Sequence, residues 1–240
     1  MVTAVTLDFW NTLIDDYRFA ERRELRATRL AAALAPHGYE GGTDPIDDAF
    51  AASWDHFERV WRHEHRTPTT AESMDMILTA LEVTVPDDVR DELTRMMEEL
   101  LLETPPRPVA GVPETLPLLA QRYALAVVCD AGLSPGRTLR KVLELHGLAA
   151  HFRFMFFSDE HGVSKPDPRA FTLTLDELGV QPTQTVHVGD IQRTDVAGAH
   201  GAGMRAVLFA GMSAADVEVS TAEAVVYWFP DLPATLKRLG

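Results

Sequence analysis

The chain is poor in residues that cross-link a protein or anchor it in a membrane. Its 240 residues include a single cysteine, Cys129, which excludes an internal disulfide and a multi-cysteine zinc site. No apolar run approaches the roughly 20 residues that a helix needs to cross a bilayer. The N-terminal MVTAVTLDFW has neither a basic region nor a cleavage site typical of a signal peptide. We therefore expect a cytoplasmic protein that does not enter a membrane.

Positive charge is also scarce. Lys and Arg number 22 against 36 Asp and Glu, so the formal net charge is −14. No basic block is dense enough to follow a nucleic-acid backbone, and nucleic-acid binding is disfavoured. A small anionic substrate would need positive charge supplied locally, by a metal ion or a few well-placed side chains. The sequence gives no indication of an oligomeric state.

Hydrophobic periodicity divides the chain into a helical block and an alternating block. The apolar, β-branched segment 2–9 favours a buried strand. Apolar residues then recur at three- and four-residue spacing, which predicts helices over 15–35, 44–65, 68–83 and 86–103. Four prolines follow in segment 105–113, as in a linker.

Beyond Gly111, strand patterns at 123–130, 152–159, 185–190 and 204–210 alternate with helical patterns at 134–147, 167–179 and 194–203. This alternation predicts an α/β fold with a doubly wound parallel sheet. Because the first strand precedes the helical block, we expect that block to be an insertion. The predicted domains are a core over 1–14 and 104–240 and an all-α domain over 15–103.

Polar residues follow four of the predicted strands. They are Asp8, the pair Cys129-Asp130, the pair Ser158-Asp159 and the pair Gly189-Asp190. Ligands of open parallel sheets bind beyond the carboxyl ends of the strands. Aspartate is also a common turn residue, so each position alone is weak, but the four together predict a site at this edge.

Three segments make the chain resemble the haloacid dehalogenase-like superfamily, in the subgroup with a helical cap inserted after the first core strand. They are LDFWNTL around Asp8, GVSKPDPRAF around Lys165, and HVGDIQRTDVAGAHGAG with Asp190 and Asp195. The resemblance covers nearly the whole chain. It implies a Rossmann-like core, and a hydrolase whose nucleophile Asp8 is transiently phosphorylated.

The resemblance also implies roles for individual residues. Mg²⁺ would offset the repulsion between Asp8 and the phosphoryl group. Its implied ligands are the carboxylates of Asp8 and Asp190 and the main-chain carbonyl of Trp10, with Asp195 supporting the site. Lys165 would pair with Asp8 and the phosphoryl group. Thr12 would position the loop after Asp8, or be a simple turn residue.

Two positions depart from the family pattern. Family phosphatases usually carry a second aspartate, a general acid and base, where this chain has Trp10, and such catalysis contributes about 10²–10⁴-fold. Cys129 replaces the usual Ser or Thr at the end of the second core strand. Because a thiol is a weak donor, we expect phosphate binding to rely on the backbone N–H groups of Asp130 and Ala131.

These departures leave three functions open. The first is a phosphohydrolase acting on a small phosphorylated metabolite, possibly one with a good leaving group such as an anhydride, diphosphate or acyl phosphate. The second is a metal-independent 2-haloacid dehalogenase, although such enzymes carry a small polar residue where this chain has Asp190. The third is a repurposed fold without phosphatase activity. A Schiff-base route through a cap lysine is excluded because the first lysine is Lys141.

Segment 54–70 is dense in histidine, arginine and aromatic residues. At helical spacing His56, Arg59 and His63 could share a face, which suggests an anion-binding pocket with Arg59 as a substrate contact. A solvated helix face with interleaved glutamates is the alternative interpretation. The aromatic residues of the segment are expected in the core of the cap: Trp54, Phe57 and Trp61.

Overall fold

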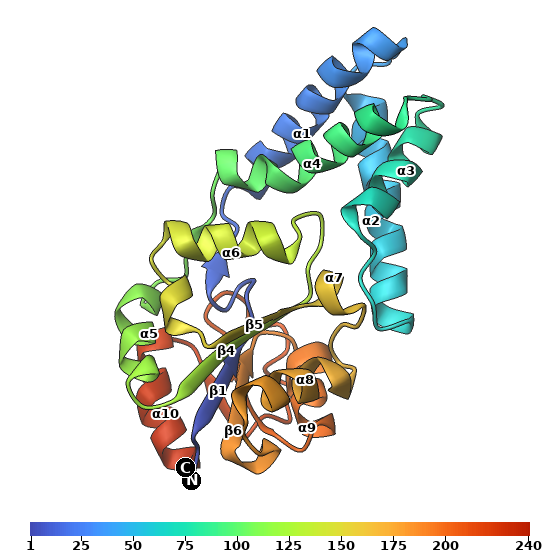
Figure 1. The fold of residues 1–240 in the computed structure, drawn as a ribbon. Helices are drawn as coiled ribbons and strands as arrows, with labels where there is room; N and C mark the ends of the chain where they lie inside the picture. The colour runs from blue at the N-terminus through green and yellow to red at the C-terminus, as the bar shows by residue number, and fades with distance from the viewer.

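A six-stranded sheet forms the centre of the protein in the computed structural model, which describes residues 1–240 (Figure 1). In spatial order its strands are β5 (Phe154–Phe157), β4 (Ala124–Cys129), β1 (Ala4–Leu7), β6 (Thr185–Gly189), β7 (Arg205–Phe209) and β8 (Ala224–Val226). Every neighbouring pair is parallel. The predicted doubly wound parallel sheet is thus confirmed, with the first strand of the chain near its middle.

The register of the central strands places their carboxyl ends level with one another. Leu7 of β1 lies beside Val127 of β4 on one side and Val188 of β6 on the other. Asp8 therefore leaves the sheet between the residues that follow β4 and β6. This alignment gathers side chains from three separate parts of the sequence at one edge of the sheet.

Successive residues of each strand point to opposite faces of the sheet, and both faces are covered. Val127 belongs to a core that includes side chains of α5 (Val112–Ala120), α6 (Gly136–Leu145) and α10 (Leu232–Leu239). Its neighbour Val128 belongs to a second core, with side chains of α8 (Pro168–Leu178) and α9 (Ala197–Gly201). Burial on both faces explains why the strands are almost uninterruptedly apolar.

Four helices stand away from the sheet as a separate group (Figure 1). They are α1 (Phe19–Leu34), α2 (Asp44–His63), α3 (Thr70–Ala80) and α4 (Asp87–Glu103). They share a hydrophobic core of their own, which includes Leu30, Ile46, Ile77 and Met97. We call this group the cap; the domain boundaries proposed from the sequence stay a prediction. No helix in the structure is both long and apolar enough to cross a membrane.

Two short antiparallel strands, β2 (Ile14–Asp15) and β3 (Arg107–Pro108), connect the sheet to the cap. The buried guanidinium of Arg22 on α1 secures this junction. Its nitrogens donate to the hydroxyl of Thr104 at 3.1 Å and to the carbonyl of Thr104 at 2.6 Å, and it pairs with Asp16. The helix predicted over 15–35 begins only at Phe19, because the residues before it form the junction between sheet and cap.

Candidate active site

The loop that follows β1 holds Asp8 in a fixed position. Only 6% of Asp8 is exposed, and its backbone N–H donates to the carbonyl of Val188 at 2.9 Å. The chain then turns sharply through Asn11, whose φ of 57° is a left-handed conformation that asparagine tolerates better than most residues. The Asn11 amide donates to Oδ2 of Asp190 at 3.3 Å. The turn therefore links the loop after β1 to the loop after β6.

Lys165 is the partner of Asp8. Its ammonium lies 2.5 Å from Oδ1 of Asp8 and 2.7 Å from Oδ1 of Asp195, and 2% of the residue is exposed. Burial on its own would lower the pKa of Lys165. The two carboxylates, Asp195 first and then Asp8, outweigh burial and hold that pKa well above its ordinary value. Lys165 is therefore a positive charge beside Asp8.

Asp195 holds Lys165 in place. Its Oδ1 also accepts from Nε2 of His187 at 3.1 Å, and its Oδ2 accepts from the backbone N–H of Ile191 at 2.9 Å. The other ring nitrogen of His187 lies 2.8 Å from the hydroxyl of Thr6. Burial lowers the pKa of His187, so it is a neutral ring that donates to Asp195 and accepts from Thr6. Both oxygens of Asp195 are thus engaged by the protein, which suits a supporting role better than direct metal ligation.

Negative charge is crowded at this edge of the sheet. Burial raises the pKa of Asp8 well above its ordinary value, and burial together with Asp195 raises the pKa of Asp190 to about 7. If Asp8, Asp190 and Asp195 are all ionised, Lys165 balances one of three charges. Asp130 adds a further carboxylate near Lys165, so this edge carries an excess of negative charge that a divalent cation would offset.

The donor set also fits Mg²⁺. No group of three or more His, Cys, Asp or Glu side chains in the structure has the geometry of a metal site. Magnesium usually needs only one or two carboxylates, because it keeps several water molecules. Asp8 and Asp190 supply that number, and Asp195 stays with Lys165.

The residues after β4 differ from what we expected. Cys129 is fully buried in the sheet core and does not line the pocket, so its thiol is not a phosphate contact. The Ala131 N–H donates to the hydroxyl of Ser158 at 2.8 Å, so it is not free for phosphate. Asp130 accepts from the Lys165 backbone N–H at 2.9 Å and from the Trp61 indole N–H at 2.7 Å. Asp130 therefore lines the pocket and holds Lys165 and Trp61 in position.

Two other expected site residues also lie off the pocket. Arg59 is exposed on the outer side of α2, where its guanidinium lies 2.7 Å from Nδ1 of His56. Helical spacing predicts which residues share a face but not which face meets the core, and this prediction was wrong. Thr12 is fully buried and its hydroxyl makes no hydrogen bond, so no positioning contact supports its expected role.

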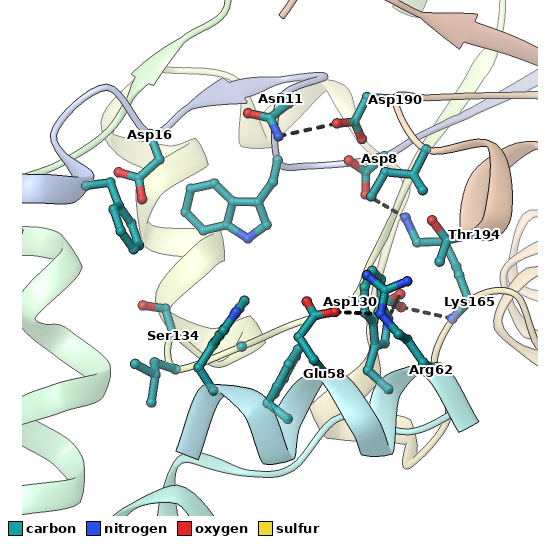
Figure 2. A pocket seen from close by; sticks show the side chains of 18 of the residues that line it. Asp8, Asn11, Asp16, Glu58, Arg62, Asp130, Ser134, Lys165, Asp190 and Thr194 are labelled. Atoms are coloured by element: carbon teal, nitrogen blue, oxygen red, sulfur yellow. Dashed lines mark hydrogen bonds and ion pairs between the residues drawn. The ribbon is translucent and has the colours of Figure 1, made fainter. Parts of the chain in front are cut away.

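A cavity of about 900 Å³ opens between the sheet edge and the cap. Asp8, Lys165 and Asp190 line it from the core. Figure 2 shows Glu58 and Arg62 projecting into it from the opposite side, from helix α2. Trp10 lines it as well, half-buried, with its ring centroid 4.9 Å from that of Phe9. Trp10 thus places an apolar ring where family phosphatases usually carry a general acid.

The aromatic residues of α2 were expected in the cap core, and the structure corrects this. Trp54, Phe57 and Trp61 all line the cavity. The rings of Trp54 and Phe57 are stacked, with centroids 4.8 Å apart. Phe57 is buried while Trp54 is 49% exposed, so these rings cover the active site and do not belong to the core of the cap.

Arg193 is a site residue that the sequence did not indicate. It lines the cavity from the short π-helical turn Gln192–Val196, between Asp190 and Asp195. Its guanidinium lies 4.1 Å from the ring centroid of Trp61. Burial, followed by the nearby charge of Arg62, lowers the pKa of Arg193. The only signal in the sequence was its place within the third motif.

Backbone and hydroxyl contacts hold the cap loop after α2 against the core. The Ser164 N–H donates to the carbonyl of His65 at 2.8 Å, and the Thr70 hydroxyl donates to the carbonyl of Leu133 at 3.0 Å. The Thr67 hydroxyl lies 2.6 Å from that of Ser158. These contacts close one side of the cavity and fix α2 over Asp8.

The fold is a doubly wound parallel sheet with a helical cap, and Asp8, Lys165 and Asp195 meet at the end of its central strand. The sequence profile of the haloacid dehalogenase-like hydrolases matches residues 2–203, and the chain belongs to this family.

Known relatives include phosphatases. The chain is 45% identical over 88 residues to phosphoserine phosphatase of Thermus thermophilus, covering 37% of this chain and 35% of that protein. It is 31% identical over 134 residues to glyceraldehyde 3-phosphate phosphatase of Pyrococcus furiosus, covering 55% of each. The matches thus span about half or less of these curated relatives.

Solved structures match over nearly the whole chain. A 2-haloacid dehalogenase of Pseudomonas syringae pv. Tomato has a TM-score of 0.77 and 26% identity, with 100% of both chains covered. A HAD hydrolase of Bacillus subtilis bound to magnesium has a TM-score of 0.67 and 19% identity, with 98% of both chains covered. At 19% identity, the similarity to the Bacillus subtilis protein shows a shared fold.

Proposed function

We propose that the protein is a Mg²⁺-dependent phosphohydrolase that acts on a small phosphorylated metabolite through an aspartyl-phosphate intermediate. The observation that carries the proposal is the contact between Asp8 and Lys165 at the end of the central strand, with Asp190 beside them. The similarity to two phosphatases supports the same chemistry.

In the first step an oxygen of Asp8 attacks phosphorus, and the bond from phosphorus to the leaving group breaks. Lys165 stabilises the negative charge on the phosphoryl oxygens and keeps Asp8 oriented. Bound Mg²⁺, held by Asp8 and Asp190, would supply electrostatic stabilisation of the phosphoryl group. In the second step water attacks the aspartyl phosphate, which releases inorganic phosphate and restores Asp8.

Trp10 limits the range of suitable leaving groups. Its ring cannot protonate a departing alkoxide, so an alkyl monoester lacks the help that a second aspartate would give. A phosphoanhydride or acyl phosphate releases a leaving group that needs no proton. We therefore propose that such substrates are preferred over simple alkyl phosphates.

Phosphate release from acetyl phosphate, pyrophosphate and ethyl phosphate, with and without Mg²⁺, tests this proposal. We expect release that depends on Mg²⁺, is fastest for the anhydride and acyl compounds, and disappears in Asp8→Asn. Faster hydrolysis of ethyl phosphate than of either other compound would contradict the leaving-group preference. Absence of release from all three would contradict phosphohydrolase activity.

A 2-haloacid dehalogenase is the second candidate, favoured by the full-length similarity to the Pseudomonas syringae enzyme. In that chemistry Asp8 would displace halide from carbon. Asp190, placed beside Asp8 by its bond to Asn11, argues for a cation instead. Chloride release from 2-chloropropionate in the presence of a chelator would support the dehalogenase and overturn our assignment.

A further inference from the structure

Arg193 has hydrogen-bond donors that no group of the protein accepts. Both terminal nitrogens of its guanidinium are buried and make no hydrogen bond. A buried charged donor without a partner is costly, and nothing in the phosphoryl-transfer steps described above uses Arg193. A group of this kind facing a cavity beside a nucleophile points to a ligand that completes its hydrogen bonds.

Arg62 approaches the same place from the cap. Its guanidinium lies 5.7 Å from the ring centroid of Trp61, the ring over which Arg193 also lies. Figure 2 shows Arg62 projecting from α2 toward the side of the cavity that holds Asp8 and Asp190. The indole N–H of Trp61 donates to Asp130 at 2.7 Å, so the ring near which both arginines lie is held in place. One arginine comes from the core and the other from the cap.

We propose that Arg193 and Arg62 bind a carboxylate of the substrate, next to the phosphoryl group that Asp8 attacks. The substrate is then a small phosphorylated acid. This inference rests on the proposed phosphohydrolase function for the identity of the group at Asp8. The planar guanidinium of Arg193 offers two parallel N–H donors, which match the two oxygens of a carboxylate.

The charge at the two arginines favours a carboxylate over a second phosphoryl group. Arg62 already pairs with Glu58, with 2.7 Å between Nε and Oε2. The guanidinium of Arg193 still lacks hydrogen-bond partners, but Asp130 and Glu58 already lie near its charge, so a ligand group with a single negative charge suits it best. A doubly charged group would add repulsion from the neighbouring acids Glu58 and Asp130, which line the same cavity.

Binding to a variant that cannot react tests the carboxylate site directly. Phosphoglycolate and ethyl phosphate differ only in a carboxylate that replaces a methyl group. We would titrate each into Asp8→Asn with Mg²⁺ present and measure the ratio of the two dissociation constants by calorimetry. We expect phosphoglycolate to bind about tenfold more tightly or better, because hydrogen bonds to charged groups are among the strongest.

The variant Arg193→Met in the Asp8→Asn background should bring this ratio close to one. Arg62 is exposed and pairs with Glu58, so Arg62→Met should leave the fold intact and reduce the ratio less than Arg193→Met does. The matched control is Arg95→Met, since Arg95 is an exposed cap arginine that lies off the cavity. It should keep the full preference. Equal binding of the two ligands, or a preference that survives in Arg193→Met, would overturn the inference.

Turnover separates this inference from the proposed function. Phenyl phosphate and 3-carboxyphenyl phosphate both have leaving groups that need little protonation. We expect kcat/KM to favour the carboxylated compound by about tenfold, and the preference to vanish in Arg193→Met. Hydrolysis of both compounds at equal rates would overturn the carboxylate site and leave the phosphohydrolase intact. Hydrolysis of neither, with phosphoglycolate still preferred in the binding experiment, would overturn only the phosphohydrolase.

Discussion

The indole N–H of Trp61, on cap helix α2, donates a 2.7 Å hydrogen bond to the carboxylate of Asp130, at the end of core strand β4. Asp130 also accepts from the backbone N–H of Lys165 at 2.9 Å. One carboxylate therefore connects the cap to the loop that carries Lys165. The position of α2 over the cavity and the position of Lys165 depend on the same residue.

We predict that Trp61→Phe, which keeps the ring and removes the N–H, lowers kcat/KM by about tenfold through a higher KM. The loss reflects an unpaired Asp130 oxygen and a cap that closes less firmly. Steady-state kinetics measure the effect. Arg59→Ala, on the outer side of the same helix, is the control and should leave KM unchanged. The prediction fails if the two variants behave alike.

Lys165→Met should reduce kcat by at least about 10²–10³-fold, the loss typical of a removed charge stabiliser. It should also destabilise the Mg²⁺-free protein by about 3 to 5 kcal/mol, because Asp8 and Asp195 lose a buried partner. Single-turnover phosphate release and urea unfolding measure the two effects. Lys141→Met is the control: that lysine is exposed and pairs with Glu99 at 3.3 Å, so its loss should cost at most about 1 kcal/mol. A Lys165→Met enzyme with nearly normal kcat would contradict the role assigned to this residue.

Much of the sheet could be predicted because a buried parallel strand leaves a strong pattern. The expected segments 123–130 and 185–190 contain β4 and β6 almost residue for residue. Shorter elements left weaker patterns. The three residues of β8 were not predicted, and α5 was obscured by Pro113 at its start and Pro117 within it. Prolines near a predicted linker gave no reason to expect a helix there.

The site residues likewise fall into those that the sequence predicts and those that it does not. Asp8, Lys165 and Asp190 lie in motifs that can be recognised from the sequence, and the structure brings them together. The contributions of Arg193, His187 and Trp61 depend on distances between segments far apart in the chain. His187, for example, lies next to Thr6 and Asp195 only because β6 pairs with β1. Periodicity along one helix or strand carries no such information, and the same limitation misplaced Arg59.

Cys129 should be inert toward thiol reagents in the native protein. It is fully buried, and burial followed by the nearby charge of Asp8 raises the pKa of its thiol well above the ordinary value. The reactive thiolate is thus scarce at neutral pH. We expect no alkylation by iodoacetamide in native buffer and complete alkylation in denaturant, as measured by intact-protein mass. Rapid native labelling with loss of activity would show that the thiol faces the cavity after all.

The last prediction concerns Trp10, the residue that separates this site from that of a typical family phosphatase. Trp10→Asp places a carboxylic acid where a departing alkoxide could take its proton. Hydrolysis of ethyl phosphate should therefore rise by about tenfold or more, toward the 10²–10⁴-fold contribution of an optimised general acid. Hydrolysis of acetyl phosphate needs no such proton and should change little. Trp10→Asn has nearly the same shape as Trp10→Asp but no proton to donate, so it separates acid catalysis from the simple opening of the cavity. An equal gain in both variants would mean that Trp10 restricts access; a gain in Trp10→Asp alone would mean that its main effect is the missing acid.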